Sequence, residues 1–178
     1  MLSMVKRIVL INDANIQTGI AEEKLIHTER TPLHRGFSLF LFNARHDVLI
    51  TKRSLTAISF PGLWSNTLKG HQGLGESALA SAKIGLVEVL GIPLESVYEI
   101  VEISPYRFQF VDHNGIMENE ICTIVVAKGE TDPKPDRRFV TDYKWVNWYK
   151  FAGLIEARPR EYAPWCKEEA KILMSLGY

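Results

Sequence analysis

Strand-forming segments constrain the fold of this chain more than any other feature of its sequence. Runs rich in β-branched and aromatic residues lie between turn signals at 7–11, 35–43, 48–52, 98–110, 119–128 and 143–148. Residues 44–47 are typical of a hairpin connection between the second and third runs. Helices are favoured only at 77–90, with Ser77 as N-cap and Gly91 as stop, and at 164–176. The pattern predicts an α+β fold, a mixed β-sheet sandwich flanked by helices.

Length, charge and cysteine count exclude several classes of protein and of binding partner. The chain has 178 residues with 21 Lys and Arg against 21 Asp and Glu, which predicts a single domain without a global field for nucleic acid or anionic membranes. No apolar stretch reaches the roughly 18 residues of a membrane span. Cys122 and Cys166 are too few for a disulfide framework. We therefore expect a cytoplasmic protein in which any charge-based function is local.

Histidines and glutamates form the pattern that points most directly to chemistry. His27, His34 and His71 precede Glu118 and Glu120, which are two apart at the start of a predicted strand and so share one face. Paired carboxylates repel unless a cation, a proton or hydrogen bonds hold them. Three imidazoles and two carboxylates suit a divalent metal, with Zn, Mn or Fe favoured over Ca. From spacing alone, exposed loop histidines and a solvated strand face are the competing interpretation.

Several separated motifs occur in an order that identifies a family. They are HTERTPLHRGFSLFLFN, FPGLWSN followed by a Gly-His pair, a helix opened by GES, then GIMENE and APW. Together they resemble the type 1 isopentenyl-diphosphate isomerases of the Nudix superfamily, over nearly the whole chain. The resemblance implies one Nudix-fold domain over residues 1–178, an isoprenoid substrate, and a monomer or homodimer.

The resemblance also implies roles for individual residues. The family's metal ligands match His27, His34, His71, Glu118 and Glu120, which would hold a divalent Zn, Mn or Mg ion. Glu120 matches the glutamate that binds metal and delivers a proton to the alkene. Trp165 matches the tryptophan whose π face stabilises the carbocation, as the negative potential over an indole ring allows.

Two catalytic positions depart from the family. Lys69 stands where the family has its catalytic cysteine, and Phe108 where it has a tyrosine that assists protonation. Lys69 is either a replacement cation or, if desolvation lowers its pKa, a general base. Tyr106, two residues before Phe108 on the same strand face, could substitute for the missing hydroxyl. Cys166, beside Trp165, is the one thiol expected to face the site.

The positions at which the family binds the substrate's diphosphate differ in this sequence as well. The Nudix box begins with Gly70 and Glu76, but its later part reads Ile84-Gly85 and Glu88-Val89. A ligand of a second, substrate-linked magnesium falls on Val89, and a phosphate-binding arginine falls on Gly85. The second magnesium is therefore in doubt.

Few cations are left to bind phosphate. Arg53 persists, whereas the family's two lysine positions fall on Glu23 and Ala57, with Lys24 and Lys52 nearby. A charge-assisted contact contributes about 1.5–3 kcal/mol, so these losses predict weak diphosphate binding, which Glu23 would weaken further.

Four functions follow from these features. A divergent isoprenoid enzyme would protonate an alkene and quench the carbocation through Lys69, water or an internal double bond, giving isomerisation or cyclisation of a non-standard substrate. The alternatives are a genuine isopentenyl/dimethylallyl diphosphate isomerase, a Nudix diphosphate hydrolase, and a non-catalytic binding protein. The retained ligand set favours the first.

Overall fold

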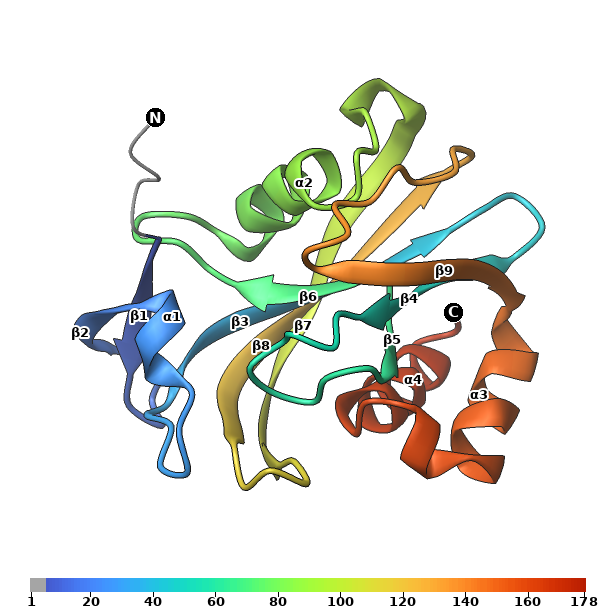
Figure 1. Cartoon of the computed structure of the whole chain (residues 1–178). Helices are drawn as coiled ribbons and strands as arrows, with labels where there is room; N and C mark the ends of the chain where they lie inside the picture. The colour runs from blue at the N-terminus through green and yellow to red at the C-terminus, as the bar shows by residue number, and fades with distance from the viewer. Residues whose placement is uncertain (1–5) are drawn as a thin grey trace.

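A nine-stranded mixed sheet with helices on both faces makes up the computed structural model, which describes residues 6–178 (Figure 1). The strands are β1 (Arg7–Ile11), β2 (Gln17–Glu22), β3 (His34–Phe42), β4 (Asp47–Arg53), β5 (Trp64–Ser65), β6 (Leu68–His71), β7 (Val97–Val111), β8 (Met117–Gly129) and β9 (Val140–Asn147). The helices are α1 (Glu23–Ile26), α2 (Ala78–Glu88), α3 (Trp148–Ala157) and α4 (Trp165–Ser175), with 3-10 turns at Leu94–Ser96 and Pro159–Glu161.

Strand β3 is the centre of the sheet. It pairs in parallel with β8 and antiparallel with β1, β4 and β6. Antiparallel β7 extends the sheet beyond β8, and β9 and β5 pair with β4. Strands β6, β3, β8 and β7 therefore lie side by side in that order.

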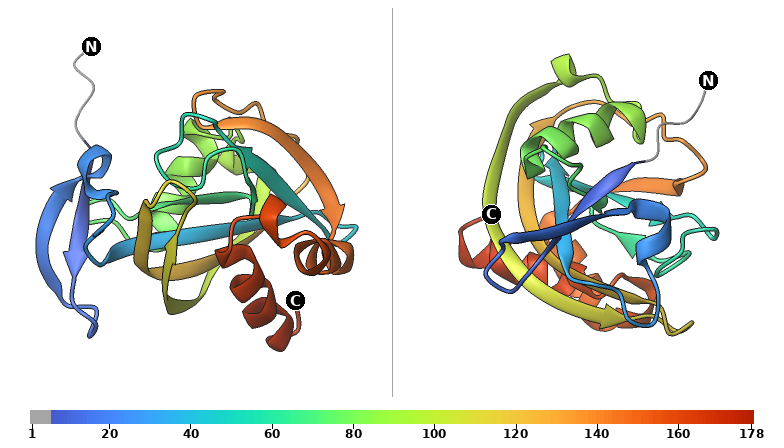
Figure 2. Two further views of the ribbon diagram at one scale, coloured as in Figure 1. Left: turned by 60° about the horizontal axis from the view of Figure 1, so that its bottom comes forward. Right: turned by 90° about the vertical axis from the view of Figure 1, so that its left-hand side faces the viewer.

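The two faces of the sheet bury different cores. Helix α2 covers one face, where Leu39 and Leu49 pack with Leu86. Helices α3 and α4 cover the other, where Phe40 and Ile50 pack with Trp148, Trp165 and their neighbours. Figure 2 shows α3 and α4 together on the side of the sheet away from α2. Because side chains alternate along a strand, each central strand contributes to both cores.

The predicted fold class is confirmed, and so are the helix start at Ser77 and the hairpin after β3. The Ser77 side chain accepts a hydrogen bond from the Ala80 backbone N–H at 3.1 Å, the N-cap contact expected of serine. In the hairpin, Asn43 Oδ1 accepts from the backbone N–H groups of Arg45 and Asp47. None of the helices in residues 6–178 is long and apolar enough to cross a membrane.

Short elements were missed by the sequence prediction. Strands β2, β5 and β6 and helix α1 are too short or too polar to show a periodicity. Trp148 was expected to end a strand but begins α3, because Asn147 caps that helix by accepting from the Lys150 N–H at 3.4 Å. Helix α3 packs on α4 and so completes the layer behind the sheet.

Candidate functional site

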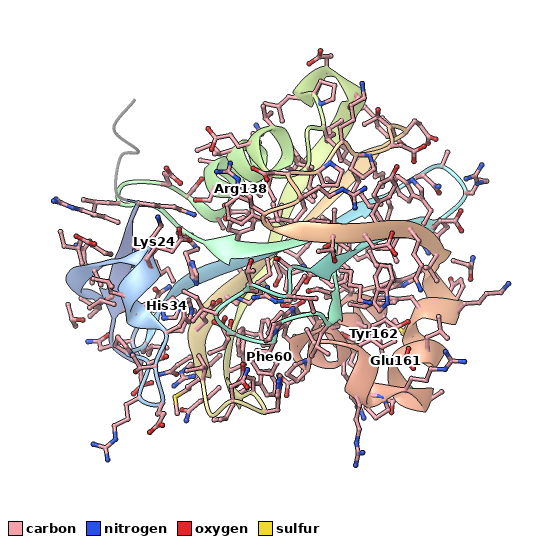
Figure 3. All side chains as sticks on the ribbon, viewed as in Figure 1. Lys24, His34, Phe60, Arg138, Glu161 and Tyr162 are labelled. Carbon is pink, nitrogen blue, oxygen red and sulfur yellow. The ribbon has the colours of Figure 1, made fainter. Side chains whose placement is uncertain are left out.

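Strand register gathers polar side chains at one end of the sheet. His34, at the start of β3, lies opposite Glu120 of β8, and Gly36 lies opposite His71 at the end of β6. Glu118 and Glu120 share one face of β8, as predicted from their spacing. His27 follows α1 and reaches the same place. Figure 3 shows His34 near α1, at the end of the sheet away from α3 and α4.

The predicted histidines and Glu118 converge into a group that could hold a metal ion. One ligand atom each from His27, His34, His71 and Glu118 lies within 4.8 Å of all the others. The imidazole centroids are 4.9–5.5 Å apart. This donor set and spacing fit a divalent transition metal. Glu120 lies at its edge, with Oε1 3.4 Å from His34 Nε2 and 3.6 Å from His71 Nε2.

Neighbouring groups fix the orientation of two of the imidazoles. His34 Nδ1 donates to the Pro32 carbonyl at 2.8 Å, and His71 Nδ1 donates to Glu23 Oε1 at 2.7 Å. Burial lowers the pKa of His71 to about 4, so its Nε2 carries a lone pair. His34 Nε2 is buried without a hydrogen-bond partner among the described residues. The Nε2 atoms of His34 and His71 thus both lie near Glu120 Oε1, where a bound cation would join them.

Each of the two glutamates has a second partner. Glu118 accepts a hydrogen bond from the Ser59 hydroxyl and contacts His27 Nε2 at 3.1 Å. Glu120 accepts from Lys69 Nζ. Burial opposes ionisation of both carboxylates, but the charge of Lys69 lowers the pKa of each below its ordinary value. Two carboxylates in a buried place therefore remain ionised because a cation faces them.

Lys69 is that cation, and its surroundings bear on its two predicted roles. Its side chain is 3% exposed, and its Nζ lies 5.2 Å from the Phe108 ring and 5.4 Å from the Trp165 ring. Burial lowers its pKa, but Glu120 and Glu118 outweigh burial and raise the pKa above the ordinary lysine value. The raised pKa favours the role of a replacement cation over that of a neutral lysine base.

Trp165 is held rigidly beside this cation. Its indole N–H lies 3.1 Å from both Ser65 Oγ and Asn66 Oδ1, and its side chain is fully buried. The Arg53 guanidinium lies 5.4 Å from the ring. The face of the indole therefore borders two positive charges, which its quadrupole attracts.

The two basic residues predicted to bind substrate lie apart. Arg53 is half-buried and donates to the carbonyl groups of Ser59 and Phe60 at 2.8 and 3.2 Å. Lys52 Nζ instead lies 5.9 Å from the Trp64 ring. The structure thus brings Arg53 to the site beside Trp165, where its donors hold the 59–60 loop, and places Lys52 against a different aromatic ring.

Phe108 and Tyr106 share one face of β7, as expected, with ring centroids 5.4 Å apart. The Tyr106 hydroxyl donates to Glu169 Oε1 at 2.8 Å. Sequence reasoning missed Glu169, which is fully buried on α4. Its spacing of one helical turn after Trp165 was the signal that could have revealed it.

The positions that replace the family's phosphate ligands have structural partners of their own. Glu23 contacts His71 and, at 3.0 Å, Lys6. A Cβ at Gly85 would stand 2.3 Å from Leu68 Cδ2, so a longer side chain does not fit there unless Leu68 moves. Lys24 is exposed. Glu23 therefore orients His71, one of the candidate metal ligands, and Gly85 is a packing position.

Comparison with known proteins identifies the family of this chain. The NUDIX domain family matches residues 32–166. Isopentenyl-diphosphate Delta-isomerase of Saccharopolyspora erythraea is 32% identical over 97% of this chain and 88% of its own length. The enzymes of that name from Enterobacter sp. and Escherichia coli O139:H28 are 35% and 33% identical, over 95% and 96% of this chain and 91% and 95% of their own lengths. The chain belongs to the Nudix isopentenyl-diphosphate isomerase family.

Solved structures show the same fold at lower identity. The DR0079 protein of Deinococcus radiodurans superposes with a TM-score of 0.74 at 15% identity, covering 97% of this chain and 100% of that one. A MutT protein of Methanosarcina mazei gives a TM-score of 0.56 at 17% identity, with 79% and 91% covered. These likenesses confirm the Nudix fold.

Proposed function

We propose that this family member is a metal-dependent isoprenoid enzyme that protonates an alkene and holds the resulting carbocation beside Trp165. One observation carries the proposal: a fully sequestered cation, the Lys69 ammonium, already lies between the Glu120 carboxylate and the faces of Trp165 and Phe108. Surroundings that stabilise a buried ammonium also stabilise the positive charge of a carbocation.

The metal would be held by His27, His34, His71 and Glu118, with Glu120 at its edge. When bound, it would supply fixed positive charge that keeps the ligand carboxylates ionised and in place. Glu23 and the Pro32 carbonyl keep two of the histidines in the ligating tautomer.

Glu120 is the proposed proton donor. Because it is ionised and hydrogen-bonded to Lys69, the proton that it delivers is drawn from the Lys69 ammonium. Proton transfer along this contact creates Glu120–OH, which then protonates the terminal carbon of the alkene. Positive charge develops on the adjacent carbon, facing the indole of Trp165.

The substrate of this proposal carries no tightly bound diphosphate. Arg53 is engaged with loop carbonyls, Glu23 is negative, and Gly85 and Val89 offer no ligand. We infer a larger or neutral isoprenoid alkene, whose cation is quenched by proton loss or by an internal double bond.

A second candidate is isopentenyl diphosphate isomerisation itself. It is favoured by the 32–35% identity to enzymes of that name over nearly the whole chain. It requires that Arg53 and Lys52 bind the diphosphate in place of the family's other cations.

Turnover in deuterated water separates the candidates. The chain, supplied with Mn²⁺, is incubated with isopentenyl diphosphate, with isopentenol, and with longer linear isoprenols that carry a terminal alkene. Deuterium in products of the neutral alkenes supports the first candidate, and deuterium in dimethylallyl diphosphate supports the second. If no substrate gains deuterium while Mn²⁺ binds, alkene protonation is overturned and a binding role is left.

A further inference from the structure

Helix α4 directs a carboxyl group, as well as Trp165, toward the site face of the sheet. Glu169 follows Trp165 by four residues, so the two side chains lie on the same side of the helix. Both are fully buried. Glu169 Oε1 accepts a hydrogen bond from the Tyr106 hydroxyl at 2.8 Å. Its Oε2 is buried and has no hydrogen-bond partner among residues 6–178.

Glu169 belongs to the same compartment as the aromatic site residues. The ring of its partner Tyr106 is 5.4 Å from that of Phe108, and Phe108 is 6.2 Å from Trp165. Tyr106 also lies opposite Cys122 in the β7–β8 register, two positions along from the pair of Phe108 and Glu120. The rings of Trp165, Phe108 and Tyr106 form a row that begins beside Lys69. The Glu169 carboxyl lies at the Tyr106 end of this row.

A packing role alone does not account for this carboxyl. An unpaired polar atom in the interior costs roughly 1–3 kcal/mol, and an apolar residue would fill the same place on α4 without that penalty. The orphaned Oε2 is the kind of buried group that functional sites retain.

Moving a double bond requires a second group, which accepts the proton that the cation loses. The nearby alternatives are poor acceptors. Lys69 has given its proton to Glu120 in the first step, and a proton taken back along that contact only restores the substrate. Burial raises the pKa of the Cys122 and Cys166 thiols, and burial together with the Glu169 charge raises that of the Tyr106 hydroxyl. The thiols and the hydroxyl therefore keep their own protons and are not ready acceptors.

We propose that Glu169 is the second proton-transfer residue of this site and accepts, through Oε2, the proton released by the carbocation. The inference rests on the proposed function. A C–H bond next to the cationic carbon breaks, its electron pair forms the new double bond, and the proton bonds to Glu169 Oε2. The resting state returns when Glu169 passes one proton back to the Lys69–Glu120 pair.

The electrostatic surroundings of Glu169 suit a base. Burial raises its pKa to about 8, against the opposing influence of the Ser38 and Tyr106 hydroxyls and the Lys69 charge. The charged or titratable groups that face it are Lys69 from β6, Tyr106 from β7, Glu120 and Cys122 from β8, and Cys166 from its own helix. A carboxylate of this basicity is near the best strength for proton acceptance at neutral to mildly alkaline pH.

The test compares Glu169→Gln with wild type in deuterated water, above the pKa of Glu169. Glu168→Gln is the matched control, because Glu168 is the preceding, exposed residue of the same helix. Isopentenyl diphosphate and isopentenol with Mn²⁺ are the probes, and both product and recovered substrate are analysed. We expect Glu169→Gln to lose rearranged product by about 100-fold or more, while deuterium exchange into the recovered substrate falls less than about fivefold.

This split distinguishes proton acceptance from a structural role. Protonation by Glu120 and its reversal persist without Glu169, whereas a disturbed site would slow exchange and product formation together. Equal loss of both rates, or full product formation by Glu169→Gln, overturns the inference and leaves the proposed function standing. A wild-type chain without product or exchange on these probes and on the longer linear isoprenols overturns the proposed function, and the inference with it. In wild type, product formation should also rise with pH through about 8, and this rise should be absent in Glu169→Gln.

Discussion

Lys69 and Glu120 form a buried ion pair at the edge of the metal-ligand group. The side chains are 3% and 0% exposed, and the ammonium donates to Glu120 Oε1. The same oxygen faces the Nε2 atoms of His34 and His71 at 3.4 and 3.6 Å. An ammonium and a divalent metal would therefore compete for the charge of one carboxylate.

Replacing Lys69 should lower the stability of the metal-free protein and raise its affinity for metal. Lys69→Met removes the ammonium and leaves Glu120 buried without its partner. We expect the metal-free protein to lose about 3–5 kcal/mol of unfolding free energy, the usual cost of breaking a buried pair. Mn²⁺ or Zn²⁺ should bind at least about tenfold more tightly, because a like charge close to the site is gone. Denaturant unfolding with a chelator and competition titration of the metal measure the two effects.

The matched control is Lys128→Met. Lys128 pairs with Glu99 at 2.8 Å, and both side chains are 43% exposed, so neither stability nor metal binding should change appreciably. If Lys69→Met binds metal more weakly than wild type, the ammonium and the metal do not compete for Glu120.

Glu23 should tune the metal site from outside the ligand group. Its hydrogen bond to His71 Nδ1 holds the imidazole with Nε2 toward the site. We expect Glu23→Ala to weaken metal binding by about 10–100-fold, the usual range for the loss of a carboxylate behind a histidine ligand. Competition with a fluorescent chelator measures the affinity. The control is Glu22→Ala, because Glu22 is the adjacent residue and is exposed. This variant should bind metal as wild type does. Equal affinities for the two variants would show that Glu23 does not orient His71.

Strand periodicity made much of the site predictable. Alternation along β8 placed Glu118 and Glu120 on one face, and the family motifs supplied His27, His34 and His71. Helix α1 and strand β6 were not predicted, since they are short and held in place by tertiary contacts. The candidate ligands were therefore named before the elements that carry them.

Lys69 and Glu169 show where sequence reasoning reached its limit. The pKa of Lys69 depends on opposing effects of burial and of two carboxylates, and only the packed structure sets their balance. Glu168 and Glu169 look alike in sequence, yet one is exposed and the other is buried against Tyr106, 63 positions away. Long-range pairing of this kind leaves no local pattern.

Gly36 should be required for the position of Glu120. A Cβ at this residue would lie 1.8 Å from Glu120 Oε2, so Gly36→Ala must push the carboxylate away. We expect a loss of about 1–3 kcal/mol of stability and weaker metal binding. Gly153→Ala in α3 is the control, because a Cβ there meets nothing within 4 Å; it should keep or slightly raise stability. If Gly36→Ala unfolds at the same temperature as wild type, Glu120 has room to move and the prediction is wrong.

The Glu169 carboxyl should make stability fall as pH rises. Its pKa is raised from 4.5 to about 8 in the folded chain, whereas the unfolded chain releases the proton near the ordinary value. Between these limits the folded state binds more protons, so the free energy of unfolding decreases with rising pH. The shift corresponds to on the order of 5 kcal/mol as an upper bound. We expect this contribution to be fully present below about pH 4.5 and lost by about pH 8.

Glu169→Gln isolates that contribution, because glutamine is similar in shape and does not titrate. The difference in unfolding free energy, wild type minus variant, should decrease steadily between about pH 5 and pH 8 and then level off. Denaturant unfolding in the presence of a chelator measures it without interference from metal. Glu168→Gln should give a difference that is flat over the same range, since that side chain is exposed. A flat difference for Glu169→Gln as well would mean that the buried carboxyl titrates as it does in water.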